Sequence, residues 1–142
     1  MKNILYTLIL LAAISAQAAD KKPVKVFILA GQSNMEGKGK VDPLLNHQIH
    51  APETKKFFAH FHKDGKYIER EDVWINFLNR RGRLTVGFGS PGRIGPELEF
   101  GHVVGDHYEE PVLIIKTAWG GKSIGRDFRP PSSGLPPKEE LD

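Results

Sequence analysis

Two continuous apolar runs stand out in the pattern of hydrophobic and polar positions along the chain. The first covers residues 24–30 and is interrupted only by Lys25, and the second covers residues 112–116 and ends in Lys116. Neither run alternates between apolar and polar side chains, as a strand with one solvated face does. The pattern therefore predicts two parallel strands, of which the first is a central strand covered on both faces.

A helix is predicted at residues 96–108, between the two runs. Gly95 and Pro96 form a loop-to-helix pair, and Glu-Glu-Pro at residues 109–111 ends the helical pattern. Positions i, i+3, i+4 and i+7 of one helix face are occupied by Phe100, Val103, Val104 and His107. A helix joined by a short loop to a parallel strand is one step of a doubly wound sheet, which places the chain in the α/β class.

The segment between the first strand and this helix is long and combines several short predicted elements. A short helix is predicted at residues 53–62, because three phenylalanines there lie at i, i+1 and i+4. An extended segment is predicted within residues 66–78, where Val73, Ile75 and Phe77 occupy every second position. Residues 79–83 are basic and typical of a turn. Long connections of this kind often carry substrate contacts.

The amino terminus has the pattern of a secretory signal. Lys2 precedes an apolar run at residues 4–13, and Ala16 and Ala18 occupy the two positions that a signal peptidase reads. The run is shorter than the roughly 20 residues that a membrane span needs. We expect residues 1–18 to be a cleaved signal peptide, residues 19–142 to form the mature protein, and the protein to be secreted or periplasmic without a membrane partner after cleavage.

Composition narrows the classes of function. Residues 1–18 contain one lysine and no acid, so the mature chain would hold 19 basic and 17 acidic residues, a balance that does not indicate a polyanionic partner. There is no cysteine, which excludes disulfides, thiolate metal sites and a cysteine nucleophile.

Residues 31–35, Gly-Gln-Ser-Asn-Met, follow the first apolar run directly. Ligands of open α/β sheets bind at the carboxyl ends of the strands, and a serine on a tight strand-to-helix turn can present a nucleophile there. The alternative is that Ser33 caps the amino end of the next helix with its side chain. On the local pattern alone, the cap is the favoured interpretation.

Three sequence blocks occur in order and carry a family resemblance. They are Gly-Gln-Ser-Asn-Met at residues 31–35, Ile-Gly-Pro-Glu at residues 94–97, and Ile-Lys-Thr-Ala-Trp-Gly-Gly-Lys-Ser-Ile at residues 115–124. Together the blocks resemble the sialate O-acetylesterase-like group of the SGNH hydrolase superfamily, which includes acetylxylan esterases of carbohydrate esterase family six. The resemblance covers residues 24–131. It implies a flavodoxin-like three-layer α/β/α sandwich and a serine hydrolase that removes O-acetyl groups from carbohydrates.

The resemblance also implies roles for individual residues. Ser33 matches the nucleophile, and its backbone N–H and that of Gly95 are the expected oxyanion donors, with Gly92 as a weaker candidate for the second donor. Glycine suits such a position because it lets the backbone approach closely. Substrate contacts are expected at Gln32, Asn34, Trp119, Gly120 and Gly121.

Two later blocks of the family are absent. The sequence contains no Gln-Gly-Glu, and no aspartate is followed by a histidine three positions later, although the family takes its base and the orienting carboxylate from such a pair. We therefore expect residues 19–142 to be the amino-terminal part of the esterase domain, with an incomplete sheet whose exposed edge favours association. The alternative function is that of a catalytically inactive fragment or pseudoenzyme that retains carbohydrate binding.

The remaining candidate residues favour structural roles. The pairs His47 and His50, and His60 and His62, lack a third ligand, so neither a metal nor another cofactor is expected. The arginines of residues 80–83 have no interleaved aromatic residues, so no nucleic-acid partner is expected, and the predicted partner is an acetylated carbohydrate.

Four further side chains have structural interpretations. Helix-dipole complementarity explains Glu97 and Glu99, Lys116 is interpreted as the end of its strand, and Trp74 as packing in the core or in a subdomain. The oligomeric state stays open.

Overall fold

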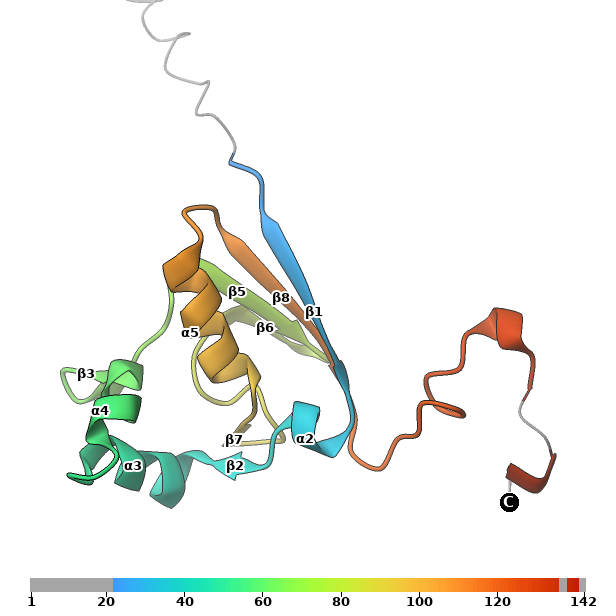
Figure 1. The fold of residues 1–142 in the computed structure, drawn as a ribbon, viewed down its shortest axis with the longest axis horizontal. Helices are drawn as coiled ribbons and strands as arrows, with labels where there is room; N and C mark the ends of the chain where they lie inside the picture. Colours follow the sequence, from blue (N-terminus) through green and yellow to red (C-terminus); the bar gives the residue numbers. More distant parts are fainter. Residues whose placement is uncertain (1–21, 136–137, 141–142) are drawn as a thin grey trace, which may run out of the picture.

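The computed structural model describes residues 22–135 and 138–140, and the predicted signal peptide lies outside them. A four-stranded sheet in the order β1-β8-β5-β6 forms its centre (Figure 1). Strands β1 (Lys25–Gly31), β8 (Val112–Ala118) and β5 (Val73–Phe77) are parallel, and β6 (Arg80–Arg83) is antiparallel to β5. Helix α5 (Glu97–His107) packs on one face of the sheet. The α/β fold class is confirmed, as are the predicted helix and both apolar strands.

The first strand is not central among the described residues. β1 pairs only with β8, in a register that joins Lys25 to Val112 and Gly31 to Ala118, so β1 is an edge of the sheet. Its side chains alternate between half-buried and exposed positions. The prediction of a strand covered on both faces is therefore wrong for this part of the chain, because α5 covers one face and no described helix covers the other.

The covered face of the sheet holds the main core. It is built from alternate residues of β5 and β8 together with the segment that leads to α5, and Phe27 and Leu29 of β1 pack at its side. Gly101 lets α5 approach closely, because a Cβ there would lie 2.0 Å from Cδ2 of Leu84. The fully or nearly buried members are Val73, Ile75, Phe77, Leu84, Phe88, Val112, Ile114 and Ala118.

The opposite face of the sheet is apolar and exposed. Val26 and Ile28 of β1 expose 53% and 67% of their surface, and Ile115 of β8 exposes 37%. Trp74 of β5 also lies on this face and is 39% exposed, so its predicted place in the core is wrong. The alternation of β5 was enough to predict a strand, and the structure shows which of its two faces is solvated.

Residues 80–83 form a strand instead of the predicted basic turn. The chain reverses at Leu78, which has a positive φ of 55°, and β6 then pairs with β5 from Phe77 opposite Arg80 to Trp74 opposite Arg83. The guanidinium of Arg80 lies 4.9 Å from the ring centre of Phe77 and donates to the carbonyls of Gly87 and Gly89. Arginine is tolerated here because β6 is a sheet edge and its alternate side chains reach solvent.

Short elements fill the connection between β1 and α5. The predicted helix at residues 53–62 is shorter: α4 ends at Phe58, a turn of 3-10 helix follows at Ala59–Phe61, and an extended strand begins at His62. A second small core joins this region to α5 through Leu45, Ile49, Phe61 and Leu98. The elements are α2 (Ser33–Glu36), β2 (Gly39–Lys40), α3 (Asn46–His50), α4 (Lys55–Phe58), β3 (His62–Lys63), β4 (Lys66–Tyr67) and β7 (Arg93–Ile94).

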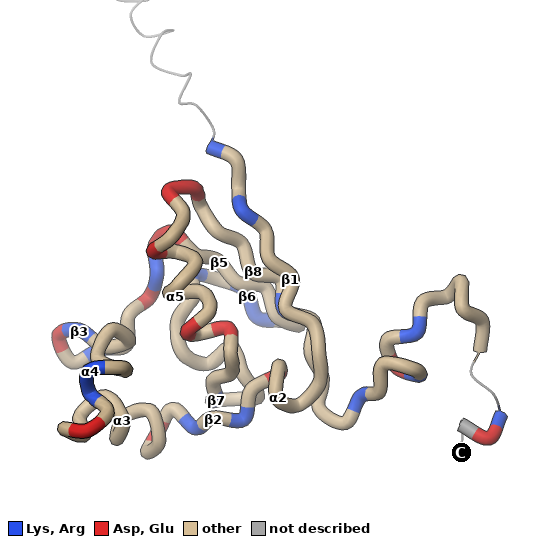
Figure 2. Tube along the Cα trace, viewed as in Figure 1, with Lys and Arg blue, Asp and Glu red and all other residues tan. Residues whose placement is uncertain are grey.

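Charged residues of both signs are spread along the trace (Figure 2). After β8 the chain leaves the sheet and runs outward through short turns, including 3-10 turns at Pro131–Ser133 and Lys138–Glu140 (Figure 1). Within the described ranges, no helix has the length and apolar character that crossing a membrane would require.

Candidate active site

Ser33 lies on a tight turn at the carboxyl end of β1. It is the first residue of α2, and the turn is closed by hydrogen bonds from Glu36 N–H to Gln32 O (2.7 Å) and from Gly37 N–H to Ser33 O (3.0 Å). Gly31 is needed here, because a Cβ at that position would lie 2.8 Å from Cβ of Met35. Gln32 occupies the N-cap position and no side chain caps the helix, so the interpretation of Ser33 as a helix cap is wrong.

The second sequence block lies directly against this turn. Gly37 has a φ of 92°, and a Cβ there would lie 2.4 Å from Cα of Gly95. The N–H of Ser90 donates to Gly37 O at 2.9 Å, which fastens the loop before β7 to the same turn. Only glycine meets both requirements at position 37, since the left-handed φ and the contact each exclude a side chain. The structure thus brings Gly95 next to the segment that carries Ser33.

The backbone N–H of Gly95 has a partner inside the protein. It donates to Oε1 of Glu97 at 2.8 Å. To serve as an oxyanion donor, this N–H would have to exchange the Glu97 carboxylate for the ligand. Its role in the oxyanion hole therefore stays a prediction. Gly92, the weaker candidate, has a φ of 70° in the loop before β7.

A buried ion pair lies beneath the turn. Lys116 and Glu97 have fully buried side chains, and Nζ of Lys116 lies 2.5 Å from Oε2 of Glu97. Nζ also donates to the carbonyls of Glu36 (2.8 Å) and Phe88 (2.9 Å), so all three ammonium hydrogens have acceptors. Burial lowers the pKa of Lys116, and the bond to Glu97 opposes this shift.

These contacts correct two sequence-based interpretations. Lys116 is inside β8 and points into the core, and Glu97 is a buried partner of that lysine in addition to being near the start of α5. The available signal was a lysine in an apolar run, since lysine is almost never fully buried unless it is paired. The sequence does not say which of the 17 acidic residues is the partner.

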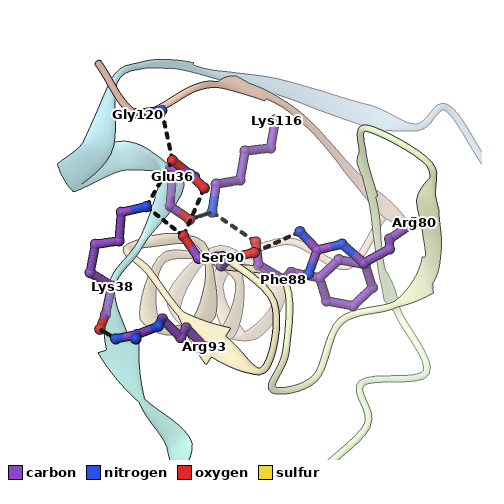
Figure 3. Close-up of polar contacts among 9 residues, drawn as sticks. Glu36, Lys38, Arg80, Phe88, Ser90, Arg93, Lys116 and Gly120 are labelled. Atoms are coloured by element: carbon purple, nitrogen blue, oxygen red, sulfur yellow. Dashed lines mark hydrogen bonds and ion pairs between the residues drawn. The ribbon is translucent and has the colours of Figure 1, made fainter. Parts of the chain in front are cut away.

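Glu36 is the centre of a second polar network (Figure 3). Its carboxylate accepts hydrogen bonds from Ser90 Oγ–H (2.7 Å), from the N–H of Gly120 (2.7 Å) and from Nζ of Lys38 (3.1 Å). Lys38 also donates to Ser90 Oγ at 2.7 Å. The bond from Ser90 is the main cause that holds the pKa of Glu36 below its usual value, with smaller contributions from Lys38 and Gly120 against the effect of burial.

The third sequence block meets Ser33 at the same sheet edge. The N–H of Trp119 donates to Gly31 O at 3.2 Å, and the Trp119 ring, 40% exposed, lies 5.5 Å from the ring of Phe128. Gly120 N–H is bound to Glu36, and Gly121 has a φ of 72°. Gln32 and Asn34 are exposed beside them. The predicted substrate-contacting residues therefore gather around one edge, although the contacts to substrate themselves stay predictions.

A cavity of about 500 Å³ adjoins this edge. Gly31 and Gln32 line one side of it, and Ser123, Ile124 and Phe128 line the other. The outer loop is held in shape by Asp127, which accepts hydrogen bonds from the N–H of Ser123 (2.8 Å) and Nζ of Lys122 (3.0 Å). The cavity offers room for a ligand next to the turn of Ser33.

No histidine of residues 22–135 and 138–140 is hydrogen-bonded to Ser33. His60 pairs with Glu99 (2.7 Å), and His50 bonds the carbonyl of Asn46. His102 is buried beside the rings of His60 and Phe61, and burial lowers its pKa. Its Nε2 has no hydrogen-bond partner in the part of the chain that the structure describes. Within those same ranges, no three His, Cys, Asp or Glu side chains are grouped as a metal site would need.

Comparison with protein families gave one match. The family model described as carbohydrate esterase, sialic acid-specific acetylesterase, matches residues 23–135, which include all three sequence blocks and the whole sheet. Comparisons with curated proteins and with solved structures gave no match.

Proposed function

The chain belongs to the sialic acid-specific acetylesterase family of carbohydrate esterases, and from that premise we propose that it removes O-acetyl groups from carbohydrates with Ser33 as the nucleophile. The observation that supports this role is the position of Ser33 on a tight turn at the carboxyl edge of the sheet, in contact with the segments of Gly95 and Gly120. Ser33 Oγ has no hydrogen bond to any described residue that would hold it away from a ligand.

In the proposed reaction, Ser33 Oγ attacks the carbonyl carbon of the acetyl ester while a base takes its proton. The tetrahedral intermediate places negative charge on the carbonyl oxygen, which the backbone N–H groups of Ser33 and Gly95 would stabilise. The bond to the sugar oxygen then breaks, the sugar leaves with the proton, and water releases acetate from the acetylated serine. None of the described histidines is hydrogen-bonded to Ser33, so the proposal assigns the base to none of them.

The proposed substrate is an acetylated carbohydrate, of the kind that acetylxylan esterases or sialate O-acetylesterases take. The exposed ring of Trp119 offers a platform on which a sugar could stack, and Gln32, Asn34 and Gly121 offer polar groups or close backbone approach beside it. The cavity between Gln32 and Phe128 gives space for the rest of the sugar. The predicted signal at residues 1–18 leads us to propose that the protein meets this substrate outside the cell or in the periplasm.

One observation favours a second function. The sequence lacks the Asp-x-x-His pair, and a serine hydroxyl without a base is a weak nucleophile. A site that lacks a triad member keeps only the contribution of binding and the oxyanion donors, on the order of 10³–10⁴ over water. The second candidate is therefore a carbohydrate-binding protein without turnover.

Acetate release separates the two functions. The wild-type chain, Ser33→Ala and the surface control Ser132→Ala are incubated with acetylated xylo-oligosaccharides and with an O-acetylated sialic acid. The esterase proposal predicts release by the wild type and the control, and none above buffer with Ser33→Ala. Equal release by all three proteins would overturn the role of Ser33. Saturable sugar binding without release by any of them would favour the second function.

A further inference from the structure

Glu36 connects the three segments that carry the site. It lies three residues after Ser33 on the same short helix, and its carboxylate binds Ser90 of the loop before β7 and Gly120 of the loop after β8. Its backbone carbonyl accepts a hydrogen bond from Lys116, which is itself paired with Glu97 at the start of α5. Figure 3 shows Glu36 between these groups.

The hydrogen-bond partners of Glu36 favour a carboxylate at this position. Three donors converge on its two oxygens, namely the hydroxyl of Ser90, the amide of Gly120 and the ammonium of Lys38. An ionised carboxylate only accepts hydrogen bonds, whereas a glutamine amide would have to turn its NH₂ group toward Ser90, whose hydroxyl would then accept instead of donate, and Lys38 would lose its charged partner. The Glu36 side chain is only 16% exposed, so water has little room to replace a lost partner.

The helix that holds Ser33 is too short to keep its position by itself. α2 has four residues, and an isolated helix of this length is not stable. Its place is set by β1 at one end. At the other end it is set by the side-chain bonds of Glu36 and by the bond from Ser90 N–H to Gly37 O. A change at Glu36 therefore acts on the turn that carries Ser33.

We propose that Glu36 is a positioning residue, whose carboxylate holds the Ser33 turn at a fixed place relative to the Gly95 segment and the Gly120 loop. It does not touch the substrate or the reacting atoms. Gly120 then has a structural part in this arrangement, because its N–H holds Glu36 and is not free for a ligand. The positioning role itself does not depend on the proposed esterase function, and only its expected effect on kcat rests on that function.

The test compares Glu36→Gln and Ser90→Ala with the matched control Glu110→Gln. Glu110 is also an ion-paired glutamate, bound to Lys25 at 3.2 Å, but it precedes β8 at the opposite end of the sheet from Ser33. The first readout is amide hydrogen exchange of peptides that span residues 32–38 and 118–122. We expect exchange there to become about 5- to 30-fold faster in Glu36→Gln, a smaller change in Ser90→Ala, and no change in β5 or in the control.

The second readout is the split between kcat and KM for acetate release. Displacement of a reacting group by about 1 Å can cost about a hundredfold in rate. We expect Glu36→Gln to lower kcat about ten- to a hundredfold with KM changed less than about twofold, because the substrate contacts remain. An unchanged kcat, or an equal fall in the control, would overturn the proposal.

The two readouts keep this proposal separate from the esterase function. If the wild type shows no turnover, the exchange experiment still decides whether Glu36 fastens the turn. Unchanged exchange at residues 32–38 in Glu36→Gln would overturn the positioning role whatever the activity. Faster exchange throughout the sheet would also count against it, because the variant would then have lost global stability instead of a local bond.

Discussion

Replacement of Lys116 by methionine is predicted to destabilise the fold strongly. The side chains of Lys116 and Glu97 are fully buried, and Nζ of Lys116 binds Glu97, Glu36 O and Phe88 O. Removal of one partner of a buried ion pair costs about 3–5 kcal/mol, because the other charge is left without compensation. Two carbonyl groups lose their donor as well, which favours the upper end of that range. Small domains have only about 5–15 kcal/mol of stability in total.

The double variant Lys116→Met/Glu97→Leu distinguishes the ion pair from simple packing. With both charges removed, no unpaired carboxylate remains, although the N–H of Gly95 and the carbonyls of Glu36 and Phe88 lose their partners. Replacement of a buried pair by apolar residues is often neutral or stabilising. We expect the double variant to regain about 2 kcal/mol or more relative to Lys116→Met. The control is Lys25→Met, which removes a partly exposed pair with Glu110 and should cost at most about 1 kcal/mol.

Urea unfolding, followed by the fluorescence of Trp74 and Trp119, measures these differences. The free energies of unfolding are compared at equal m-values, since a change in m would indicate a change in the unfolded or native ensemble. A loss below about 1 kcal/mol for Lys116→Met would refute the reasoning. So would a double variant whose loss equals the sum of the losses of Lys116→Met and Glu97→Leu measured singly, because independent sites are additive and coupled ones are not.

Three further outcomes follow from the structure. Gly37→Ala should lower the free energy of unfolding in urea by at least about 1 kcal/mol more than the matched control Gly65→Ala. Both glycines have a positive φ, but only at position 37 would the added Cβ meet a neighbour, Gly95 Cα at 2.4 Å. Equal losses in the two variants would contradict this. The pKa of Glu36 is lowered in the folded protein, so its contribution to stability is complete above the ordinary value of 4.5 and is lost as the pH falls through the lowered pKa. The difference in melting temperature between wild type and Glu36→Gln should therefore shrink on acidification, with Lys38 as the cation bound to the carboxylate, and a constant difference would count against the linkage. The exposed apolar face with Val26 and Ile28 should make the chain self-associate, and Ile28→Lys should reduce the apparent mass in light scattering; a wild-type monomer at high concentration would be evidence against that expectation.

The parts of the fold that sequence reasoning predicted are those that depend on local pattern. Residues 24–30 and 112–116 became β1 and β8, and residues 96–108 became α5, because continuous apolar runs and a clear helical period are decided mainly by burial. The hairpin of β5 and β6 was missed because its turn is formed by Leu78, a residue that rarely adopts a positive φ. Whether a strand is covered on one face or on both depends on which other elements pack against the sheet. The residues of the strand alone do not show this.

The candidate site divides in a similar way. The block at residues 31–35 indicated Ser33, and the structure places it on the expected turn next to the other two blocks. The polar network was not predictable, because its bonds join residues that are distant in the sequence. Glu36 is 54 positions from Ser90 and 84 positions from Gly120. Lys116 had a local signal, a charge within an apolar run, but its partner Glu97 was explained by the helix dipole alone. Tertiary contacts between distant segments decided these roles.

The nucleophilic role of Ser33 is the central claim, and a covalent label tests it most directly. The chain and its Ser33→Ala variant are incubated with a serine-directed fluorophosphonate, which labels an activated serine. Intact mass and peptide mapping then give the number and place of the adducts. We predict one adduct per chain, on Ser33, and none in Ser33→Ala. An unlabelled wild-type chain, or a label on another serine such as Ser90 or Ser123, would contradict the account.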